Sequence, residues 1–249
     1  RQRQMCIRDR DMRTPLGIGK GGDTTIAMDK LLEDTILELV KERGDVTVIS
    51  EEAGEFSLGN PQGYVVIDPL DGSHNFCEFI PMYSASMAYY SGPKLDDCMA
   101  ACVVDLVTGD FYTSIKGRGA WLNGSLLKTR SPKERISIGV EMHPTTDERA
   151  LCMARLIPRA GKFRCMGSVA MNLAYLARGT HSAWLDIRGH LRLLDAAAGI
   201  LLVKEAGGIV TGFNGEDIGQ NDVGLDTKLD IVASCDRDIH EKILDIIQK

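Results

Sequence analysis

The residues best suited to chemistry follow an apolar run at 65–67. Asp68 ends this run, and the proline after it favours an extended backbone at Asp68. Asp71 comes three residues later, across a tight turn. The two carboxylates and the backbone carbonyl of Leu70 could therefore converge on one point. Such hard oxygen atoms are the ligands that Mg²⁺ prefers, so the segment predicts a magnesium site.

Gly72 and Ser73 directly follow these carboxylates. Glycine allows the backbone to approach a ligand closely. A helix that begins here would direct its free N–H groups toward an anion, for which phosphate is the natural candidate. Because Asp-Gly is also a common turn dipeptide, a plain turn is the alternative for this pair taken alone.

Further carboxylates lie at the ends of other predicted elements. Glu51 and Glu52 follow an apolar strand, and Asp195 ends an apolar segment at 191–194 before a helix rich in small residues. Singly, these residues would be a solvated charge pair and a helix cap. Together with Asp68, Asp71 and the glycine at 72, they indicate a two-metal phosphoryl-transfer site.

The elements that position these residues alternate along the chain. The first half reads as a Gly-rich loop at 14–24, a helix at 29–43 and strands at 46–49, 64–67, 84–90, 99–106 and 111–115, with turns at 108–109 and 123–124. The second half reads as strands at 136–140, 183–187, 209–210 and 230–234 with helices at 147–157, 168–178, 195–206 and 238–247. This alternation predicts a layered α/β architecture.

A polar stretch near residue 132 suggests a domain boundary. We expect an α+β metal-binding part at 11–133 and an α/β substrate-binding part at 134–249. The first ten residues, RQRQMCIRDR, lack apolar periodicity and the apolar core of a signal peptide. We therefore expect residues 1–10 to be a non-native or disordered arm.

Composition excludes several classes of function. The 249 residues are 44% hydrophobic and 26% charged, as in ordinary globular proteins. The net charge of −6 argues against nucleic-acid binding as the main task. The absence of a long apolar run argues against a membrane span. Seven scattered cysteines complete no zinc pattern and favour a reduced, cytoplasmic setting.

Four segments carry a resemblance to a known family. They are SEE at 50–52, DPLDGSHN at 68–75, GSVAMNLAYLARG at 167–179 and LLDAAAGILLVKEAGG at 193–208. From about residue 14 to the end, the chain resembles the inositol monophosphatase family of the lithium-sensitive, Mg²⁺-dependent phosphatase superfamily. The stretch at 184–195 resembles its archaeal-type inositol monophosphatase/fructose-1,6-bisphosphatase branch. The resemblance implies a layered αβαβα sandwich of the sugar-phosphatase type.

The resemblance also implies roles for the carboxylates. It assigns Mg²⁺ binding to Glu51, Asp68, the Leu70 carbonyl, Asp71 and Asp195, with Glu52 beside the metals. The resemblance further implies that the Ser73 hydroxyl orients the attacking water and that Asp29 supports this hydroxyl. The catalytic set is therefore Glu51, Ser73 and Asp29.

The substrate contacts follow from the same resemblance. Gly72 and Ser73 would bind phosphate through their N–H groups, with Asp71 beside the substrate. The positions implied for sugar hydroxyls or a second phosphate are Arg164, Gly167, Ser168, Asp186 and Arg188. Lys20, in the Gly-rich loop, would close over the phosphate.

The expected function is therefore a phosphohydrolase of carbohydrate metabolism. It would remove phosphate from inositol 1-phosphate, fructose 1,6-bisphosphate or both, by in-line attack of a metal-activated water. The expected protein is a cytoplasmic homodimer with Mg²⁺ as cofactor, a small-molecule substrate and no nucleic-acid or membrane partner. Two alternatives stay open: a 3′-phosphoadenosine 5′-phosphate phosphatase, and a regulatory binding member of the same family.

Overall fold

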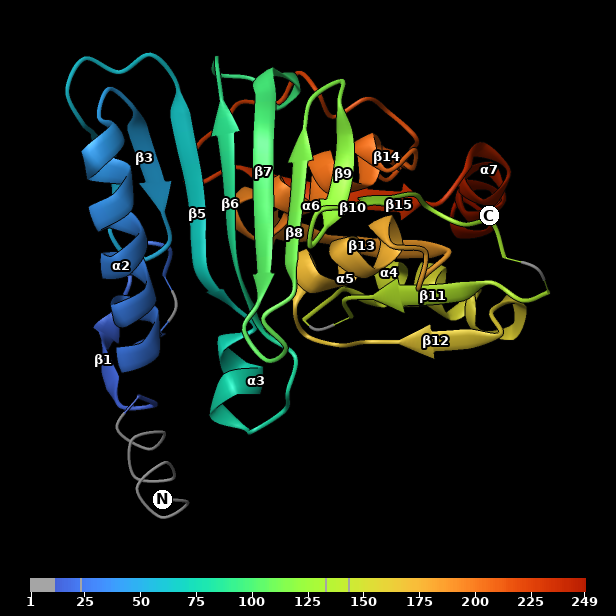
Figure 1. Cartoon of the computed structure of the whole chain (residues 1–249). Coiled ribbons are helices and arrows are strands. Elements are labelled where there is room, and N and C mark those ends of the chain that lie inside the picture. The colour runs from blue at the N-terminus through green and yellow to red at the C-terminus, as the bar shows by residue number, and fades with distance from the viewer. Residues whose placement is uncertain (1–11, 23, 133, 143) are drawn as a thin grey trace.

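A computed structural model describes residues 12–22, 24–132, 134–142 and 144–249. The predicted arm at 1–10 lies outside these residues. Two large sheets and a small hairpin organise the chain (Figure 1). Within the described residues, no helix combines the length and apolar character needed to cross a bilayer.

The larger sheet has eight strands in the order β10-β9-β8-β7-β6-β5-β3-β4. Its strands are β3 (Thr47–Ser50), β4 (Gly54–Ser57), β5 (Tyr64–Asp71), β6 (Ser84–Tyr90), β7 (Cys98–Asp105), β8 (Phe111–Ile115), β9 (Gly119–Leu122) and β10 (Ser125–Leu127). Neighbouring strands pair antiparallel except β3 and β5, which are parallel. The last two strands form a hairpin around the predicted turn at 123–124.

The smaller sheet has five strands in the order β12-β11-β13-β15-β14. Its strands are β11 (Ser137–Val140), β12 (Lys162–Arg164), β13 (Ala183–Arg192), β14 (Ile209–Thr211) and β15 (Lys228–Ser234). All residues of this sheet come from the second half of the chain, where the sequence predicts an α/β part. The division into two domains stays a prediction.

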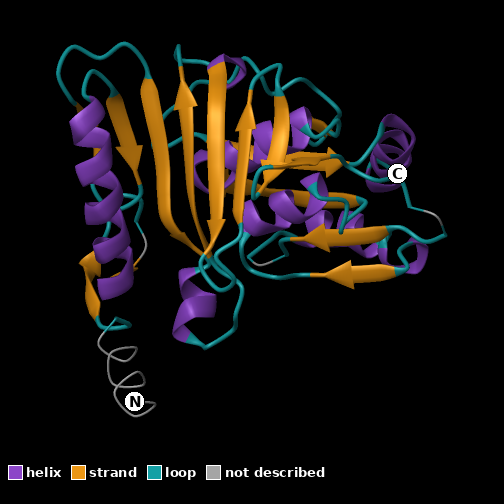
Figure 2. Ribbon diagram, viewed as in Figure 1, coloured by secondary structure: helices purple, strands orange, loops and turns teal. Residues whose placement is uncertain are grey.

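Helices fill the space between and outside the sheets. They are α2 (Ala27–Arg43), α3 (Ser73–Cys77), α4 (Asp147–Ala154), α5 (Val169–Ala177), α6 (Leu193–Glu205) and α7 (Arg237–Ile247), with single 3₁₀ turns at Leu95–Asp97 and Ile157–Arg159. α2 packs against β5 of the large sheet, α5 and α6 lie between the sheets, and α4 and α7 cover the small sheet (Figure 2). The result is the expected αβαβα layering.

The main core lies between the two sheets. It is built largely from α5 and α6, whose inward and outward faces are both buried. Helices that are apolar on all sides need such a sandwiched position. The small residues of α6 allow close packing, because a Cβ on Gly199 would lie 2.5 Å from the side chain of Leu173 on α5.

The Gly-rich segment differs from the expected loop. β1 (Pro15–Ile18) and β2 (Thr24–Ile26) pair antiparallel as a hairpin. The tip of this hairpin is fixed to the chain after β3, since the N–H of Gly21 donates to the carbonyl of Glu51 at 2.7 Å. The many glycines concealed the strand pattern in the sequence.

Candidate active site

A bulge in β5 brings Asp68 and Asp71 together. Side chains alternate between the faces of a strand, so residues three apart normally point to opposite faces. Asp68 pairs with Ser86 of β6 and Asp71 pairs with Ser84, so β5 contains one extra residue between them. Such a bulge re-aims a side chain. It therefore allows both carboxylates to serve the same side of the sheet.

Asp71 is held by the N-terminus of α5. Its carboxylate accepts hydrogen bonds from the Ser168 hydroxyl at 2.5 Å and from the N–H groups of Val169 and Ala170 at 3.0 and 2.8 Å. The Ser84 hydroxyl adds a contact at 3.3 Å. Burial and the nearby charge of Asp195 raise the pKa of Asp71 to about 6, although these hydrogen bonds favour its ionised form. Asp71 thus connects the large sheet to α5.

Asp68 is the most deeply buried of the predicted metal ligands, with 1% of its surface exposed. Its Oδ1 accepts a hydrogen bond from the N–H of Leu70 at 3.1 Å. Burial raises the pKa of Asp68 well above its usual value, and the charges of Glu51, Asp71 and Asp195 raise it further. These three carboxylates therefore lie in the electrostatic neighbourhood of Asp68.

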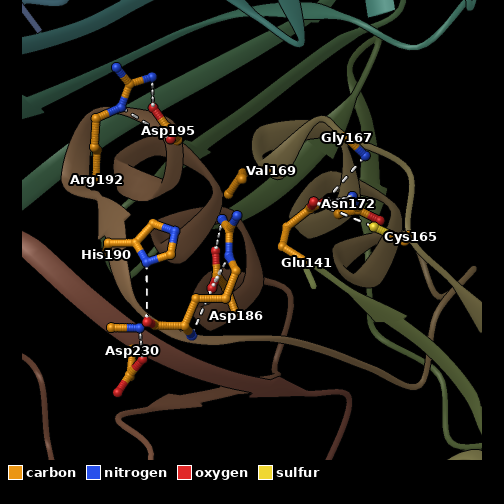
Figure 3. A network of polar contacts seen from close by, with 12 residues as sticks. Glu141, Cys165, Gly167, Val169, Asn172, Asp186, His190, Arg192, Asp195 and Asp230 are labelled. Atoms are coloured by element: carbon orange, nitrogen blue, oxygen red, sulfur yellow. Dashed lines mark hydrogen bonds and ion pairs between the residues drawn. The ribbon is translucent and has the colours of Figure 1, made fainter. Parts of the chain in front are cut away.

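Arg192 joins two more of the predicted ligands. Its guanidinium lies 2.7 Å from Oε1 of Glu51 and 3.1 Å from Oδ1 of Asp195. Figure 3 shows the contact between Arg192 and Asp195 at the start of α6. Asp195 is not the helix cap, because α6 begins at Leu193 and places Asp195 in its first turn. We missed Arg192 in the sequence, although its position three residues before Asp195 on a helix start was a usable signal.

Glu33 on α2 binds the residues on either side of Glu51 and Glu52. Oε1 of Glu33 accepts hydrogen bonds from the Ser50 hydroxyl at 2.6 Å and from the N–H of Ala53 at 2.8 Å. Only 1% of Glu33 is exposed. Glu33 was not among the predicted site residues, yet it lies one helical turn after Asp29 and so on the same face of α2.

The β1–β2 hairpin contacts Glu52 through its tip and through β2. The hydroxyl of Thr25 donates a hydrogen bond to Oε2 of Glu52, and the N–H of Lys20 donates to its carbonyl at 3.3 Å. A Cβ on Gly19 would overlap the Glu52 carboxylate. The structure therefore places Lys20 beside the carboxylates through its backbone, while its side chain is exposed.

Asp29 lies at the start of α2, where its Oδ2 accepts a hydrogen bond from the N–H of Ile26 at 2.7 Å. Burial, with Glu52, Glu51 and Glu33 nearby, raises the pKa of Asp29 to about 7. Among the described contacts there is no hydrogen bond from Ser73 to Asp29. The expected support of that hydroxyl therefore stays a prediction.

Gly72 and Ser73 begin the short helix α3, as the phosphate hypothesis requires. Gly72 has φ +92°, a left-handed conformation that favours glycine. A Cβ at this position would also lie 2.9 Å from the carbonyl of Met82. Glycine is therefore required here on two grounds, conformation and space.

The predicted sugar-contacting residues form two groups. Ser168 is buried and Gly167 is exposed, at the entry to α5. Asp186 on β13 is fully buried and forms a bidentate ion pair with Arg188, at 2.8 and 2.5 Å. This pairing indicates that Asp186 orients Arg188, whereas the sequence interpretation has Asp186 accept sugar hydroxyls directly.

Arg164 lies at the edge of the small sheet, on β12. It lines a surface groove of about 820 Å³ and its Nη1 lies 3.4 Å from the Ser137 hydroxyl. None of the predicted metal ligands lines this groove. The structure therefore does not bring Arg164 into contact with the carboxylates.

The chemistry of the donor set fits a divalent cation, and protein groups also contact its carboxylates. Among the described residues, no three or more Asp, Glu, His or Cys side chains are arranged as a ready-made metal site. Asp71 is bound by α5, and Glu51 and Asp195 by Arg192. Burial raises the pKa of Asp68, and the charges of Glu51, Asp71 and Asp195 raise it further, so a bound cation would stabilise its ionised form. Hard oxygen ligands of this kind suit Mg²⁺ rather than softer metals.

Comparisons with known proteins agree with this site. The inositol monophosphatase family profile matches residues 7–249. The chain is 35% identical over 244 residues to a fructose-1,6-bisphosphatase/inositol-1-monophosphatase of Methanothermobacter thermautotrophicus, covering 93% of this chain and 86% of that protein. A protein of the same description from Archaeoglobus fulgidus is 36% identical, covering 94% and 87%.

A solved structure shows the same fold. It is a hypothetical protein from Pyrococcus horikoshii described as similar to inositol-1 monophosphatase. The two structures agree with a TM-score of 0.79 at 32% identity, and the match covers 100% of this chain and 98% of the other. The layered architecture expected from the sequence is therefore confirmed.

Proposed function

The chain belongs to the inositol monophosphatase family, and we propose that it is a Mg²⁺-dependent phosphohydrolase acting on a sugar or polyol phosphate. Its substrates would be inositol 1-phosphate, fructose 1,6-bisphosphate or both, as the names of its relatives suggest. The observation that carries the proposal is geometric: a bulge at the end of β5 brings the buried Asp68 and Asp71 to the same side of the sheet, and Arg192 joins Glu51 to Asp195.

Glu51, Asp68, Asp71, Asp195 and the Leu70 carbonyl would hold the cations. When bound, Mg²⁺ would activate a water for in-line attack and offset the charge of the phosphate. Arg192, which contacts Glu51 and Asp195, would offset part of the negative charge of these carboxylates. Glu52 lies next to Glu51 and accepts a hydrogen bond from Thr25. It would add negative charge beside the cations without binding them directly.

The N-terminus of α3 would bind the phosphate group. Gly72 brings the backbone close, and its N–H and that of Ser73 would donate to phosphate oxygens. The Ser73 hydroxyl would orient the attacking water. Asp29, at the start of α2, would support that hydroxyl.

The entry to α5 and the loop after β13 would contact the rest of the substrate. Gly167 and Ser168 would meet sugar hydroxyls. Arg188, oriented by Asp186, supplies a fixed guanidinium for hydroxyls or for a second phosphate. Arg164 would bind a second phosphate only if that phosphate lay in the groove that Arg164 lines. Lys20, on the β1–β2 hairpin, would approach the phosphate that is hydrolysed.

The proposal includes the setting of the enzyme. A homodimer in the cytoplasm, serving carbohydrate metabolism, is what the family resemblance implies. The six cysteines among the described residues are all free thiols, which supports a reducing compartment. Sedimentation equilibrium of the purified chain tests the dimer.

Phosphate release tests the proposed function. The wild type is assayed with inositol 1-phosphate, fructose 1,6-bisphosphate and 3′-phosphoadenosine 5′-phosphate, with and without EDTA, beside Asp195→Asn. We expect turnover of one or both of the first two, lost with EDTA and in the variant. Turnover of the adenosine compound alone would favour that substrate class. No turnover by folded, Mg²⁺-loaded protein would favour a regulatory binding role.

A further inference from the structure

Asn75 belongs to the DPLDGSHN segment but has no role in the proposed function. We propose that Asn75 and Glu141 are positioning residues that fix the Gly167–Ser168 loop and so set selectivity for polyol phosphates. This inference rests on the proposed function only in assigning sugar hydroxyls to that loop. We call the two residues the loop clamp.

Asn75 clamps the loop from the side of the metal ligands. It lies on α3 and is 6% exposed. Its Nδ2 donates at 2.8 Å to the carbonyl of Met82, which follows α3, and at 2.8 and 3.3 Å to the carbonyls of Met166 and Gly167. One buried amide therefore joins the chain after β5 to the loop before α5. A buried side chain with this many partners is costly to replace by a group that cannot donate.

Glu141 clamps the same loop from the side of the small sheet. It follows β11 and is 8% exposed. Its Oε1 accepts hydrogen bonds from the N–H of Gly167 at 3.3 Å and from Nδ2 of Asn172 at 3.4 Å (Figure 3). Asn172 also donates to the carbonyl of Ser168 at 2.7 Å. Burial raises the pKa of Glu141 to about 7, which is consistent with its enclosed position.

The clamp controls a loop that is tightly packed on the phosphate side. A Cβ on Gly72 would lie 3.2 Å from the carbonyl of Gly167 and 3.3 Å from the Ser168 side chain. Gly167 has φ +70°, and a Cβ there would meet the Asn75 amide at 3.1 Å. The two loops thus touch through glycine backbone. A small displacement of Gly167 would change the distance between the phosphate and hydroxyl subsites. A substrate that contacts both subsites would then be misplaced and react more slowly.

The test uses variants that separate shape from hydrogen bonding. Asn75→Asp keeps the shape but sets a carboxylate against carbonyl oxygens. Glu141→Ala removes the acceptor of the Gly167 N–H, while Glu141→Gln keeps Oε1 as an acceptor. Asn60→Ala, in an exposed turn, is the matched control. Each is assayed with inositol 1-phosphate and with p-nitrophenyl phosphate, which lacks hydroxyls. Hydrogen–deuterium exchange of residues 164–168 is measured in parallel.

We expect Asn75→Asp and Glu141→Ala to lower kcat/KM for inositol 1-phosphate by about tenfold or more, mainly through KM. The loss with p-nitrophenyl phosphate is expected to stay within about threefold. Glu141→Gln is expected to resemble the wild type, and the loop amides are expected to exchange faster in the two damaging variants. An equal loss with both esters, unchanged loop exchange, or Glu141→Gln as damaging as Glu141→Ala would each overturn the clamp.

The two proposals can fail separately. If the wild type hydrolyses neither of these esters nor fructose 1,6-bisphosphate, the proposed function fails and the exchange rates alone decide whether the clamp fixes the loop. If the wild type is active and the variants keep its selectivity, the clamp alone fails. Glu141→Ala and Glu141→Gln leave α3 unchanged, so they test the clamp even if Asn75→Asp does not fold.

Discussion

At the scale of single residues, the site is a set of carboxylates that bind Arg192 and backbone N–H groups. Arg192 is central, because one guanidinium contacts Glu51 from the large sheet and Asp195 on α6. Its side chain is 22% exposed, so it can withdraw toward solvent. We interpret Arg192 as a counter-ion that offsets the charge of these two carboxylates and would compete with a divalent cation for them.

Replacing Arg192 with glutamine tests this interpretation. Without metal, Arg192→Gln should lower the free energy of unfolding by about 1–3 kcal/mol, because two charged contacts are lost. Its Mg²⁺ affinity should rise, because Glu51 and Asp195 no longer have a competing cation. Urea unfolding in EDTA and Mg²⁺ titration calorimetry measure the two effects, with exposed Arg237→Gln as control. Weaker Mg²⁺ binding than in the wild type would show that Arg192 instead supports the metal site.

The pH dependence of the free energy of unfolding should reveal the raised pKa of Asp29. Its pKa is about 7 in the folded chain against a reference value of 3.8, so the folded state binds its proton more tightly. The contribution of Asp29 to stability is therefore fully present below pH 3.8 and is lost as the pH rises to about 7. Asp29→Asn, which stays neutral, should gain stability over the wild type across this range. The gain should level off above it.

Urea midpoints from pH 4 to pH 8 in EDTA measure this difference. Using the difference between Asp29→Asn and wild type removes the titration of the other carboxylates. Asp34→Asn, an exposed residue on the same helix, is the control. A difference that does not change with pH would mean that Asp29 ionises normally in the folded protein.

The sequence predicted the carboxylates better than the groups that hold them. Asp68, Asp71, Gly72 and Ser73 are neighbours in the chain, so the sequence predicts that they lie close together, but a bulge in β5 and not the expected tight turn brings the two carboxylates to one side. The contact between Ser168 and Asp71 spans 97 residues, and only the packing of α5 against the large sheet creates it. Arg192, Glu33, Asn75 and Glu141 likewise bind partners that local patterns do not identify.

At the scale of elements, strand β5 and helix α6 position the site. β5 continues to Asp71 instead of ending at Ile67, because the bulge accommodates Pro69 without ending the pairing with β6. The expectation of an earlier end placed a tight turn between Asp68 and Asp71. The hairpin of β1 and β2 was missed because glycines weaken the alternation on which strand prediction depends. Longer elements with clear periodicity, such as α2 and β6, were predicted to within a few residues.

The packing of α6 on α5 gives an element-scale prediction. Gly199→Ala would place a methyl group 2.5 Å from Leu173, so the helices must separate. We expect a loss of about 1–3 kcal/mol in the free energy of unfolding. Gly224→Ala is the matched control, because its methyl group would meet its nearest neighbour at 3.5 Å. Thermal unfolding of both variants decides the matter, and equal melting temperatures would contradict close packing at Gly199.

At the scale of the whole molecule, the site belongs to both sheets and the helices between them. Asp71 ties the large sheet to α5, and Glu51 is tied through Arg192 to α6. The layered fold could be predicted from the alternation of elements and from the family resemblance. The order of strands in the sheets could not, because strand pairing depends on long-range contacts. The boundary near residue 133 stays a prediction.

Because the metal ligands come from separate elements, Mg²⁺ should stabilise the whole chain. At a concentration one hundred times its Kd, a ligand that binds only the folded state adds about 2.7 kcal/mol. For a chain of this size that corresponds to a rise in melting temperature of about 5–10 °C. Differential scanning calorimetry with Mg²⁺ and with EDTA measures the rise. Asp195→Asn should reduce it, and an equal rise in that variant would place the cation elsewhere.

The central claim is that the buried carboxylates around Asp68 form a metal-dependent hydrolytic site. Its most direct test is phosphate release from inositol 1-phosphate and fructose 1,6-bisphosphate during a Mg²⁺ titration, for wild type, Asp68→Asn and the exposed control Asp238→Asn. We predict saturable Mg²⁺ dependence for wild type and control, and a loss of roughly a thousandfold in Asp68→Asn. Hydrolysis that persists in EDTA, or that survives in folded Asp68→Asn, would contradict the account.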